Sequence, residues 1–302
     1  MEHNPAQQES NNELHGLQEE MNSATFWNDK DYAQSVIKRI KELQDIQEGV
    51  AVIDKGGAIM TLLAGAGGDD SEDFAYMLYE MYSAYCTTKG YSVTFLEENK
   101  NDRGGYRNCT LEITGKNVYG TLKSESGVHR LVRISPFNAQ AKRHTSFVLV
   151  EVLPIIPPSE QKAFSPDDIR IETSKASGPG GQNVNKRETA IRIVHIPTSI
   201  SVSVSTERKQ DQNKQKALQI LQSKLYRLEE DNRKKALDGI KISKTVEIEW
   251  GSQIRSYVLH PYKMIKDHRT GYETSNVEVV LEKGELEGFI EAQKSMLGTE
   301  GH

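Results

Sequence analysis

The sequence lacks most features that would mark an exported, membrane-bound or zinc-dependent protein. Its 302 residues include two cysteines, Cys86 and Cys109, and no His/Cys/Asp cluster has convincing zinc spacing. The longest apolar run, around residues 58–66, is far too short to span a bilayer, and the polar N-terminus has no signal-peptide core. We therefore expect a cytoplasmic protein with reduced thiols. The sequence alone leaves a bridge between the two cysteines open.

Familiar nucleotide-binding and nucleophilic motifs are also missing. A Walker loop needs Gly-Lys-Ser/Thr after its glycines, and this sequence has none. A dinucleotide fingerprint needs a third glycine at the positions that Asn183 and Asp70 occupy. No local signature supports a Ser–His–Asp triad. We therefore expect no metal, nucleotide or organic cofactor.

The charge is unevenly distributed along the chain. The formal net charge is −5, which taken alone argues weakly against a nucleic-acid partner. Between Lys175 and Lys224, however, nine basic residues stand against three acidic ones, a local charge of +6. This segment is a candidate phosphate-facing surface inside an acidic protein. The alternative is a solvated helix face with extra lysines.

The order of predicted elements indicates an α+β, multidomain protein. We expect a helical arm over residues 1–56 and a mixed α/β domain over 57–162. A second α/β domain with a long amphipathic helix follows over 163–271, and residues 272–302 form a short C-terminal helical segment that packs on the first α/β domain. The proline-rich connector at 153–166 sets the boundary near residue 163.

The stretch Ser177–Lys186, SGPGGQNVNK, combines three glycines with a glutamine but has no side-chain base or nucleophile. Gly180 and Gly181 can adopt positive φ, which lets the N–H of Gln182 point outward. A fixed backbone N–H can stabilise a developing negative oxygen, and losing one such donor costs roughly 3–4 kcal/mol. Glycine content by itself favours a mobile linker loop, so both interpretations stay open at this point.

The glycine stretch is one of six blocks that follow one another along the chain: GVHRLVRISPF, KRHTSF, SGPGGQNVNK, IRIVHIPTSI, EIEWGSQIRSYVLHPYKMIKDHRTGYET and ELEGFIEA. In this order they resemble bacterial class I peptide chain release factors, release factor 2 type. The resemblance covers about residues 58–295, and the arm before it is shorter than is usual in the family. The family reads stop codons on the ribosome and releases the finished protein.

The resemblance implies that Gly180, Gly181 and Gln182 act in the peptidyl transferase centre, beside the ester of the P-site peptidyl-tRNA. The Gln182 N–H would stabilise the transition-state oxygen, and the side chain would help to place the attacking water. Family members often carry N5-methylglutamine here, which implies a glutamine methyltransferase as a partner. Trp250 is implied to lie in a switch region that rearranges when the codon is recognised. Hydrolysis is expected only within the ribosome.

Ser135, Pro136 and Phe137 match the tripeptide that distinguishes release factor 2 from release factor 1. A serine hydroxyl can donate to O6 of guanine or accept from the N6 amino group of adenine, so it tolerates either purine at the second codon position. The resemblance implies that Pro136 fixes the loop and that Phe137 anchors it. It also implies that His144 stacks between the second and third bases and that Thr145 hydrogen-bonds near them.

The family reads the first base, uridine, with backbone groups at a helix start after a glycine loop, here Gly68 and Asp70. The usual family pattern G-G-T-E-A is replaced by GGDDS, which puts Asp70 at the glutamate position. The run NAQAKRH likewise replaces a glycine-rich, more basic run. These departures motivate one alternative, a rescue hydrolase that ignores the codon. A second alternative is a non-catalytic RNA-binding homologue.

The resemblance therefore predicts a monomeric factor that recognises UAA and UGA in the ribosomal A site. The implied partners are both ribosomal subunits, the mRNA stop codon and P-site peptidyl-tRNA, with a class II release-factor GTPase as a further candidate. No membrane association is expected. The intact SPF and HTS elements argue against the rescue alternative, and the intact GGQ element argues against the non-catalytic one.

Overall fold

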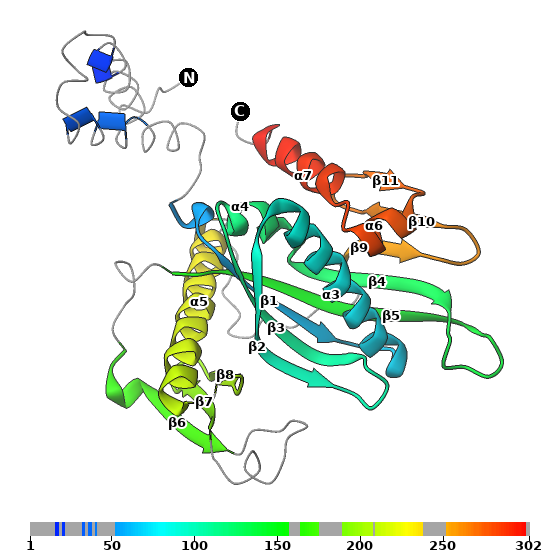
Figure 1. Cartoon of the computed structure of the whole chain (residues 1–302), viewed down its shortest axis with the longest axis horizontal. Coiled ribbons are helices and arrows are strands. Elements are labelled where there is room, and N and C mark those ends of the chain that lie inside the picture. The colour runs from blue at the N-terminus through cyan, green and yellow to red at the C-terminus, as the bar shows by residue number, and fades with distance from the viewer. Residues whose placement is uncertain are drawn as a thin grey trace. The chain divides into compact units, whose positions relative to one another are not determined.

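The computed structural model describes residues 52–156, 164–174, 189–207, 209–237 and 252–299, together with scattered positions between 16 and 40. The chain divides into two compact units, residues 1–55 and 56–302. In the second unit, helices pack on an eight-stranded sheet and a separate three-stranded sheet (Figure 1). This mixture of helices with a large sheet confirms the predicted α+β class.

The large sheet has the strand order β11-β10-β9-β4-β5-β1-β3-β2. Its strands are β1 (Ala58–Ala64), β2 (Ser92–Lys100), β3 (Tyr106–Thr114), β4 (Gly127–Ile134), β5 (Arg143–Pro154), β9 (Gln253–Val258), β10 (Met264–Asp267) and β11 (Glu273–Thr274). The short segments η2 (Val52–Lys55), α4 (Val118–Leu122) and η3 (Lys123–Glu125) join or flank these strands. Neighbouring strands are antiparallel except for β4 and β9, which run parallel.

Helix α3 (Asp69–Lys89) lies across one face of this sheet (Figure 1). Phe74, Leu78 and Met81 recur at helical spacing and are fully buried, which explains why this polar sequence forms an amphipathic helix. The helix ends at Gly90, whose φ of 72° is a conformation that glycine adopts without strain. Two C-terminal helices, α6 (Val277–Lys283) and α7 (Glu287–Thr299), complete this part, and α6 packs against α3.

The small sheet has the order β6-β7-β8 and is covered by the long helix α5 (Gln210–Leu237). Its strands are β6 (Ile169–Ser174), β7 (Ala190–His195) and β8 (Ile200–Val204), and η5 (Pro166–Asp168) precedes them. Val202 and Val204 are buried whereas Ser201 and Ser203 are exposed, so β8 alternates with a period of two in its antiparallel pairing with β7.

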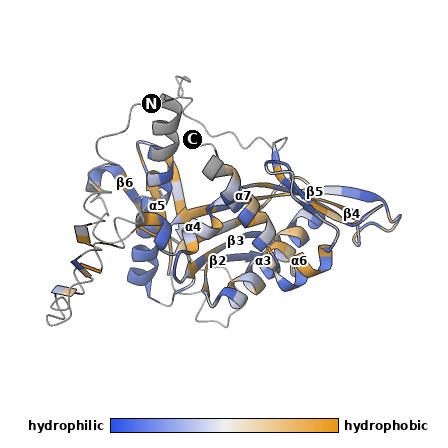
Figure 2. Cartoon of the chain, turned by 90° about the horizontal axis from the view of Figure 1, so that it is seen from above, coloured by the Kyte–Doolittle hydropathy of each residue, from blue (hydrophilic) through white to orange (hydrophobic). Residues whose placement is uncertain are grey.

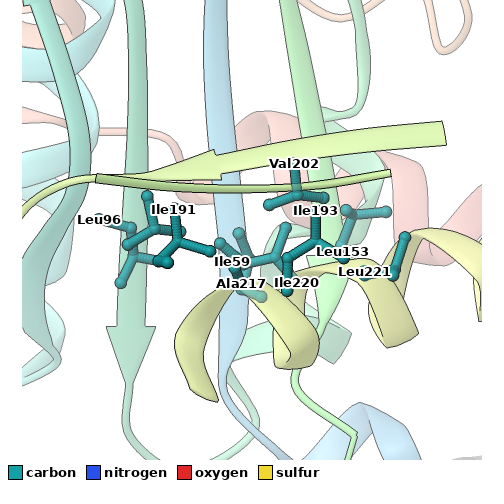
Figure 3. Packing of buried hydrophobic residues seen from close by; sticks show 10 residues of the cluster. Ile59, Leu96, Leu153, Ile191, Ile193, Val202, Ala217, Ile220 and Leu221 are labelled. Carbon is teal, nitrogen blue, oxygen red and sulfur yellow. The ribbon is translucent and has the colours of Figure 1, made fainter. Parts of the chain in front are cut away.

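A single hydrophobic cluster joins the small sheet and α5 to the large sheet (Figure 3). The large sheet contributes Ile59, Leu96 and Leu153, and the small sheet and α5 contribute Ile191, Ile193, Val202, Val204, Ala217, Ile220 and Leu221. Two ion pairs flank the cluster: Lys216–Glu112 at 3.8 Å and Lys224–Glu151 at 3.5 Å. The small sheet and α5 are thereby packed on the face of the large sheet that carries Ile59.

The C-terminal strands extend the large sheet on the side of β4. Residues 253–258 pair in parallel with β4, and residues 264–267 and 273–274 continue the sheet outward. The sequence-based division at residue 271 falls between β10 and β11, two neighbouring strands of one sheet. Pairing between strands more than 100 residues apart leaves no local signal in the sequence.

Candidate nucleic-acid interface

The structure describes only part of the predicted site. The predicted catalytic residues Gly180, Gly181 and Gln182 and the switch residue Trp250 lie outside the described residues. All of the predicted codon-reading residues are described. They gather at one end of the large sheet, where α3 begins, β4 ends and β5 begins.

The β4–β5 hairpin projects past the other strands at this end (Figure 1), and its tip carries mostly hydrophilic residues (Figure 2). We call residues 135–142 the β4–β5 loop. Hydrogen bonds close it from within: the N–H of Ser135 donates to the carbonyl of Lys142 at 3.1 Å, and the N–H of Ala141 donates to the carbonyl of Asn138 at 2.9 Å. A loop closed in this way presents side chains from a defined backbone.

A glycine turn places the start of α3 beside this loop. Gly67 has a φ of 139° and lies so close to Ser146 of β5 that a Cβ would be 2.8 Å from the hydroxyl oxygen. Gly68 has a φ of 57° and caps the helix without a side-chain bond. Among the described residues, none accepts a hydrogen bond from the backbone N–H of Asp69 or Asp70. These free donors can meet an acceptor on a ligand.

Asp70 is the centre of the site. Its carboxylate is almost fully buried and accepts a hydrogen bond from the Ser135 hydroxyl at 2.5 Å through Oδ2. The same oxygen lies 2.9 Å from Nδ1 of His144, and Oδ1 accepts from Arg133 at 3.0 Å. The start of α3 and the two ends of the β4–β5 loop, which lie 63 to 74 residues further along the sequence, therefore meet at one carboxylate.

Burial by itself would raise the pKa of Asp70. The hydrogen bonds from Ser135, Arg133 and His144, together with the Arg133 charge, outweigh it and hold the pKa below its ordinary value. Asp70 is therefore an ionised acceptor near neutral pH. An acceptor without a proton requires Ser135 to be the donor in their hydrogen bond.

The ring of His144 is oriented from both of its nitrogens. Nδ1 faces Asp70, and Nε2 lies 3.1 Å from the Nδ2 amide of Asn138 in the β4–β5 loop. This pair of contacts is satisfied when Nδ1 carries the proton and Nε2 accepts. The side chain is still 38% exposed, so a base can reach it. Thr145 follows it and is exposed.

Phe137 lies at the surface of the same site. Its backbone N–H donates to the Ser135 hydroxyl oxygen at 3.2 Å, which ties the two ends of the tripeptide together. Phe137 as a whole is 38% exposed. The guanidinium carbons of Arg103 and Arg133 lie 5.4 Å and 5.9 Å from its centroid, within the range of cation–π contact.

Sequence reasoning missed several of these contacts. It gave Asp70 a backbone role, whereas the side chain joins Ser135 to His144. It assigned nothing to Arg133, whose guanidinium also bonds Asp73 at 2.6 Å. Nothing local in the sequence shows which of many surface arginines will approach a carboxylate, although the pairing of β4 with β5 puts Arg133 opposite His144.

A second polar network is buried around Arg255 of β9. Arg255 donates to Glu125 at 2.6 Å and 2.7 Å and to Asp267 at 3.1 Å. Tyr82 also donates to Glu125, at 3.0 Å. The guanidinium carbon of Arg255 lies 4.3 Å from the centroid of the Phe289 ring in α7. The network fixes the C-terminal strands and α7 to the sheet that ends in the β4–β5 loop.

His129 of β4 belongs to the same network and is fully buried. Its Nδ1 lies 3.1 Å from the Tyr257 hydroxyl, and its Nε2 lies 3.1 Å from the carbonyl oxygen of Glu125. Burial, assisted by the Arg255 charge, lowers the pKa of His129 to about 4. The ring is neutral in the folded protein at physiological pH.

The basic segment is partly neutralised where it is described. Arg192 lies 3.9 Å from Glu172, Lys216 lies 3.0 Å from Glu207, and Lys224 pairs with Glu151. Lys209 and Lys214 are exposed near the start of α5. Fewer of these basic side chains are therefore available to phosphates than the nine counted in the sequence between Lys175 and Lys224.

The structure also describes the two cysteines, the candidate metal ligands and the helices that were considered in the sequence. Cys86 and Cys109 are unpaired and buried, and burial raises the pKa of both thiols to about 12, which leaves them unreactive. The described residues hold no group of three His, Cys, Asp or Glu side chains that could bind a metal ion. No helix within those same residues has the length and apolar composition to cross a membrane.

Comparison with known proteins places the chain in a family. The PCRF domain family matches residues 51–150, and the RF-1 domain family matches residues 159–269. Peptide chain release factor 2 of Thermotoga petrophila is 46% identical over 272 residues, which cover 88% of this chain and 74% of the relative. Peptide chain release factor 2 of Clostridium perfringens is 44% identical over 270 residues, with 87% and 74% covered.

A solved structure gives the same result. RF2 of Thermus thermophilus aligns with a TM-score of 0.73 and 38% sequence identity, over 95% of this chain and 81% of that one. The relatives, the two domain families and the shared fold agree along nearly the whole chain. The chain belongs to the class I peptide chain release factors of the release factor 2 type, a family of translation termination factors.

Proposed function

We propose that this release factor recognises UAA and UGA in the ribosomal A site and promotes hydrolysis of the peptidyl-tRNA ester. The observation that carries the proposal is the meeting of Ser135, His144 and the first turn of α3 at the Asp70 carboxylate. A codon-independent hydrolase has no need to orient these three elements together.

Each part of the interface has a role in this proposal. The free N–H groups of Asp69 and Asp70 meet the uridine of the first position. The Ser135 hydroxyl meets the purine of the second position, and His144 stacks between the second and third bases with Thr145 beside it. Pro136 limits the conformations of the turn.

Hydrolysis is assigned to Gly180, Gly181 and Gln182, on the resemblance of their stretch to the family motif. The Gln182 N–H stabilises the oxyanion, and ribosomal RNA supplies the rest of the active site. A glutamine methyltransferase that modifies Gln182 and a class II release-factor GTPase are further proposed partners. The chain is proposed to work in the cytoplasm as a monomer, with Trp250 in the switch region.

A codon-programmed release assay tests the proposal. Ribosomes carrying labelled peptidyl-tRNA are programmed with UAA, UGA, UAG or a sense codon, and peptide release is measured. We expect release on UAA and UGA only. Release on every codon would instead identify a rescue hydrolase, and release on none would identify a binding protein.

The variant Gln182→Pro tests the backbone donor, because proline has no N–H. We expect release to fall by about 100-fold or more, the loss typical of a deleted oxyanion donor. Binding to stop-codon ribosomes should persist, because the decoding residues are unchanged. The control Gln182→Ala keeps the N–H and should retain release with weaker exclusion of other nucleophiles. Equal activity of Gln182→Pro and the wild type would contradict the role.

A further inference from the structure

The β2–β3 hairpin ends in a charged tip, residues 101–105, that lies against the first turn of α3. The Asn101 side-chain oxygen accepts from the N–H of Arg103 at 2.9 Å and of Gly105 at 2.8 Å. The Asn101 amide also donates to Glu72 in α3 at 2.6 Å. Gly105 comes so close that a Cβ would lie 2.8 Å from the Glu72 carbonyl carbon. The tip is thus fixed on the helix start by its own turn.

Arg103 connects this tip to the codon-reading tripeptide. Its Nη1 lies 2.6 Å from Oδ2 of Asp69, the first residue of α3. Its guanidinium carbon lies 5.4 Å from the centroid of Phe137. Arg133 of β4 approaches the same ring at 5.9 Å, so Phe137 is contacted by one guanidinium from the β2–β3 tip and one from β4.

The two ends of the tripeptide have different anchors. Ser135 is buried and bonded to Asp70, whereas Pro136 and Phe137 are exposed. Without a contact to its ring, Phe137 would be held only through its N–H bond to Ser135 at 3.2 Å. Arg103 supplies a second anchor that is itself fixed to α3 through Asp69.

We infer that Arg103 is a positioning residue for stop-codon recognition. It holds Phe137, and with it the turn from Ser135, in the conformation that meets the codon, and it acts without touching the codon itself. The inference rests on the proposed function, since it presupposes that the tripeptide reads a codon. It adds the β2–β3 tip to the elements that set the geometry of decoding.

The expected effect separates binding from chemistry. If only a fraction of molecules has the turn in place, the apparent affinity for the codon falls by that fraction. Release itself is assigned to residues 180–182 and should proceed normally once the codon is bound. Arg103→Ala should raise the KM for UAA-programmed ribosomes by about three- to tenfold and leave kcat unchanged.

Two variants isolate the contact that matters. Arg107→Ala is the control. It removes a nearby arginine of β3 that pairs with Glu72 at 3.3 Å and has no aromatic contact among the described residues. It should leave the KM as in the wild type. Arg103→Lys keeps a cation for Asp69 but loses the planar group that covers Phe137, and should recover only part of the affinity.

A double-mutant cycle decides whether Arg103 acts through the ring. Phe137→Leu should raise the KM, and adding Arg103→Ala to it should cause little further change, because the shared contact is already lost. Circular dichroism and thermal unfolding of each variant should match the wild type, since Arg103 is exposed.

The outcomes distinguish this inference from the proposed function. Codon-independent release by the wild type would overturn both. Normal release on UAA and UGA with an unchanged KM for Arg103→Ala would overturn only the inference. So would independent, additive effects of Arg103→Ala and Phe137→Leu, or an equal rise in KM for Arg107→Ala. A selective rise for Arg103→Ala that disappears in the Phe137→Leu background supports it.

Discussion

The hydrogen bond between Ser135 and Asp70 predicts a preference between the two stop codons. Asp70 is ionised and accepts, so the single hydroxyl proton of Ser135 is already committed. The Phe137 N–H occupies one lone pair of the hydroxyl oxygen, and another remains. In this state Ser135 can accept from the N6 amino group of adenine but has no proton for O6 of guanine.

The magnitude follows from the bonds exchanged. Reading UAA keeps the Ser135–Asp70 bond, whereas reading UGA requires the proton to leave Asp70 for O6. A hydrogen bond to a charged group contributes about 1.5–3 kcal/mol and a neutral one about 0.5–1.5 kcal/mol. The difference is about 1–1.5 kcal/mol, and every 1.4 kcal/mol is tenfold in an equilibrium or a rate constant. We therefore expect kcat/KM for UAA to exceed that for UGA by roughly five- to tenfold.

The variant Asp70→Ala frees the Ser135 hydroxyl. Both rates should fall, because Asp70 also holds His144, but the ratio of UAA to UGA should approach one. His144 stacks against a purine at the second position in both codons, so its loss should lower the two rates by similar factors. Asp73→Ala is a matched control: it removes a different carboxylate from Arg133 and leaves Ser135 bonded. A wild-type ratio near one, or an unchanged ratio in Asp70→Ala, would refute the reasoning.

Two predictions concern the buried network. The pKa of His129 is about 4 in the folded protein and 6.5 in the unfolded chain. As pH falls from 6.5 toward 4, the unfolded chain therefore binds a proton that the folded protein does not. The contribution of His129 to stability is full above pH 6.5 and is lost as pH falls toward 4. The free energy of unfolding should fall by about 2 kcal/mol between pH 7.5 and pH 5, and His129→Gln should flatten this slope in urea titrations. Glu125→Gln should cost about 3–5 kcal/mol in urea unfolding at pH 7.5, because it removes the main counter-charge of the buried Arg255 guanidinium.

Controls on exposed groups make these tests specific. Glu273 forms a surface pair with Lys266 at 2.9 Å, and Glu273→Gln should change stability by less than about 1 kcal/mol. If Glu125→Gln also lost less than about 1 kcal/mol of unfolding free energy, the structural role of the buried Arg255–Glu125 pair would be contradicted. An equally steep slope between pH 7.5 and pH 5 in His129→Gln would show that another group titrates there.

The regular elements could be predicted from sequence because their signals are local. The apolar spacing of Phe74, Leu78 and Met81 marks α3, and the alternation around Val202 marks the β7–β8 hairpin. The tripeptide from Ser135 and the strand residue His144 were identified by resemblance, and both lie at the end of the sheet where α3 begins.

The couplings between these elements were not predictable. Asp70 is 65 residues from Ser135 and 74 from His144, and its side chain was assigned no role because only a fold brings the three together. The parallel pairing of β4 with β9 is equally non-local, so nothing in the sequence indicated that residues 253–258 pair with β4 of the large sheet. Arg103 in its hairpin tip has the composition of any polar turn.

The most direct test of the account compares UGA with UAG on the same ribosomes. The codons differ at the second and third bases, and the site built around Ser135 and His144 is expected to accept the first codon and reject the second. We predict rapid peptide release on UGA and no release above background on UAG at equal protein concentration. Equal rates on the two codons would contradict the claim that this end of the sheet reads the stop codon.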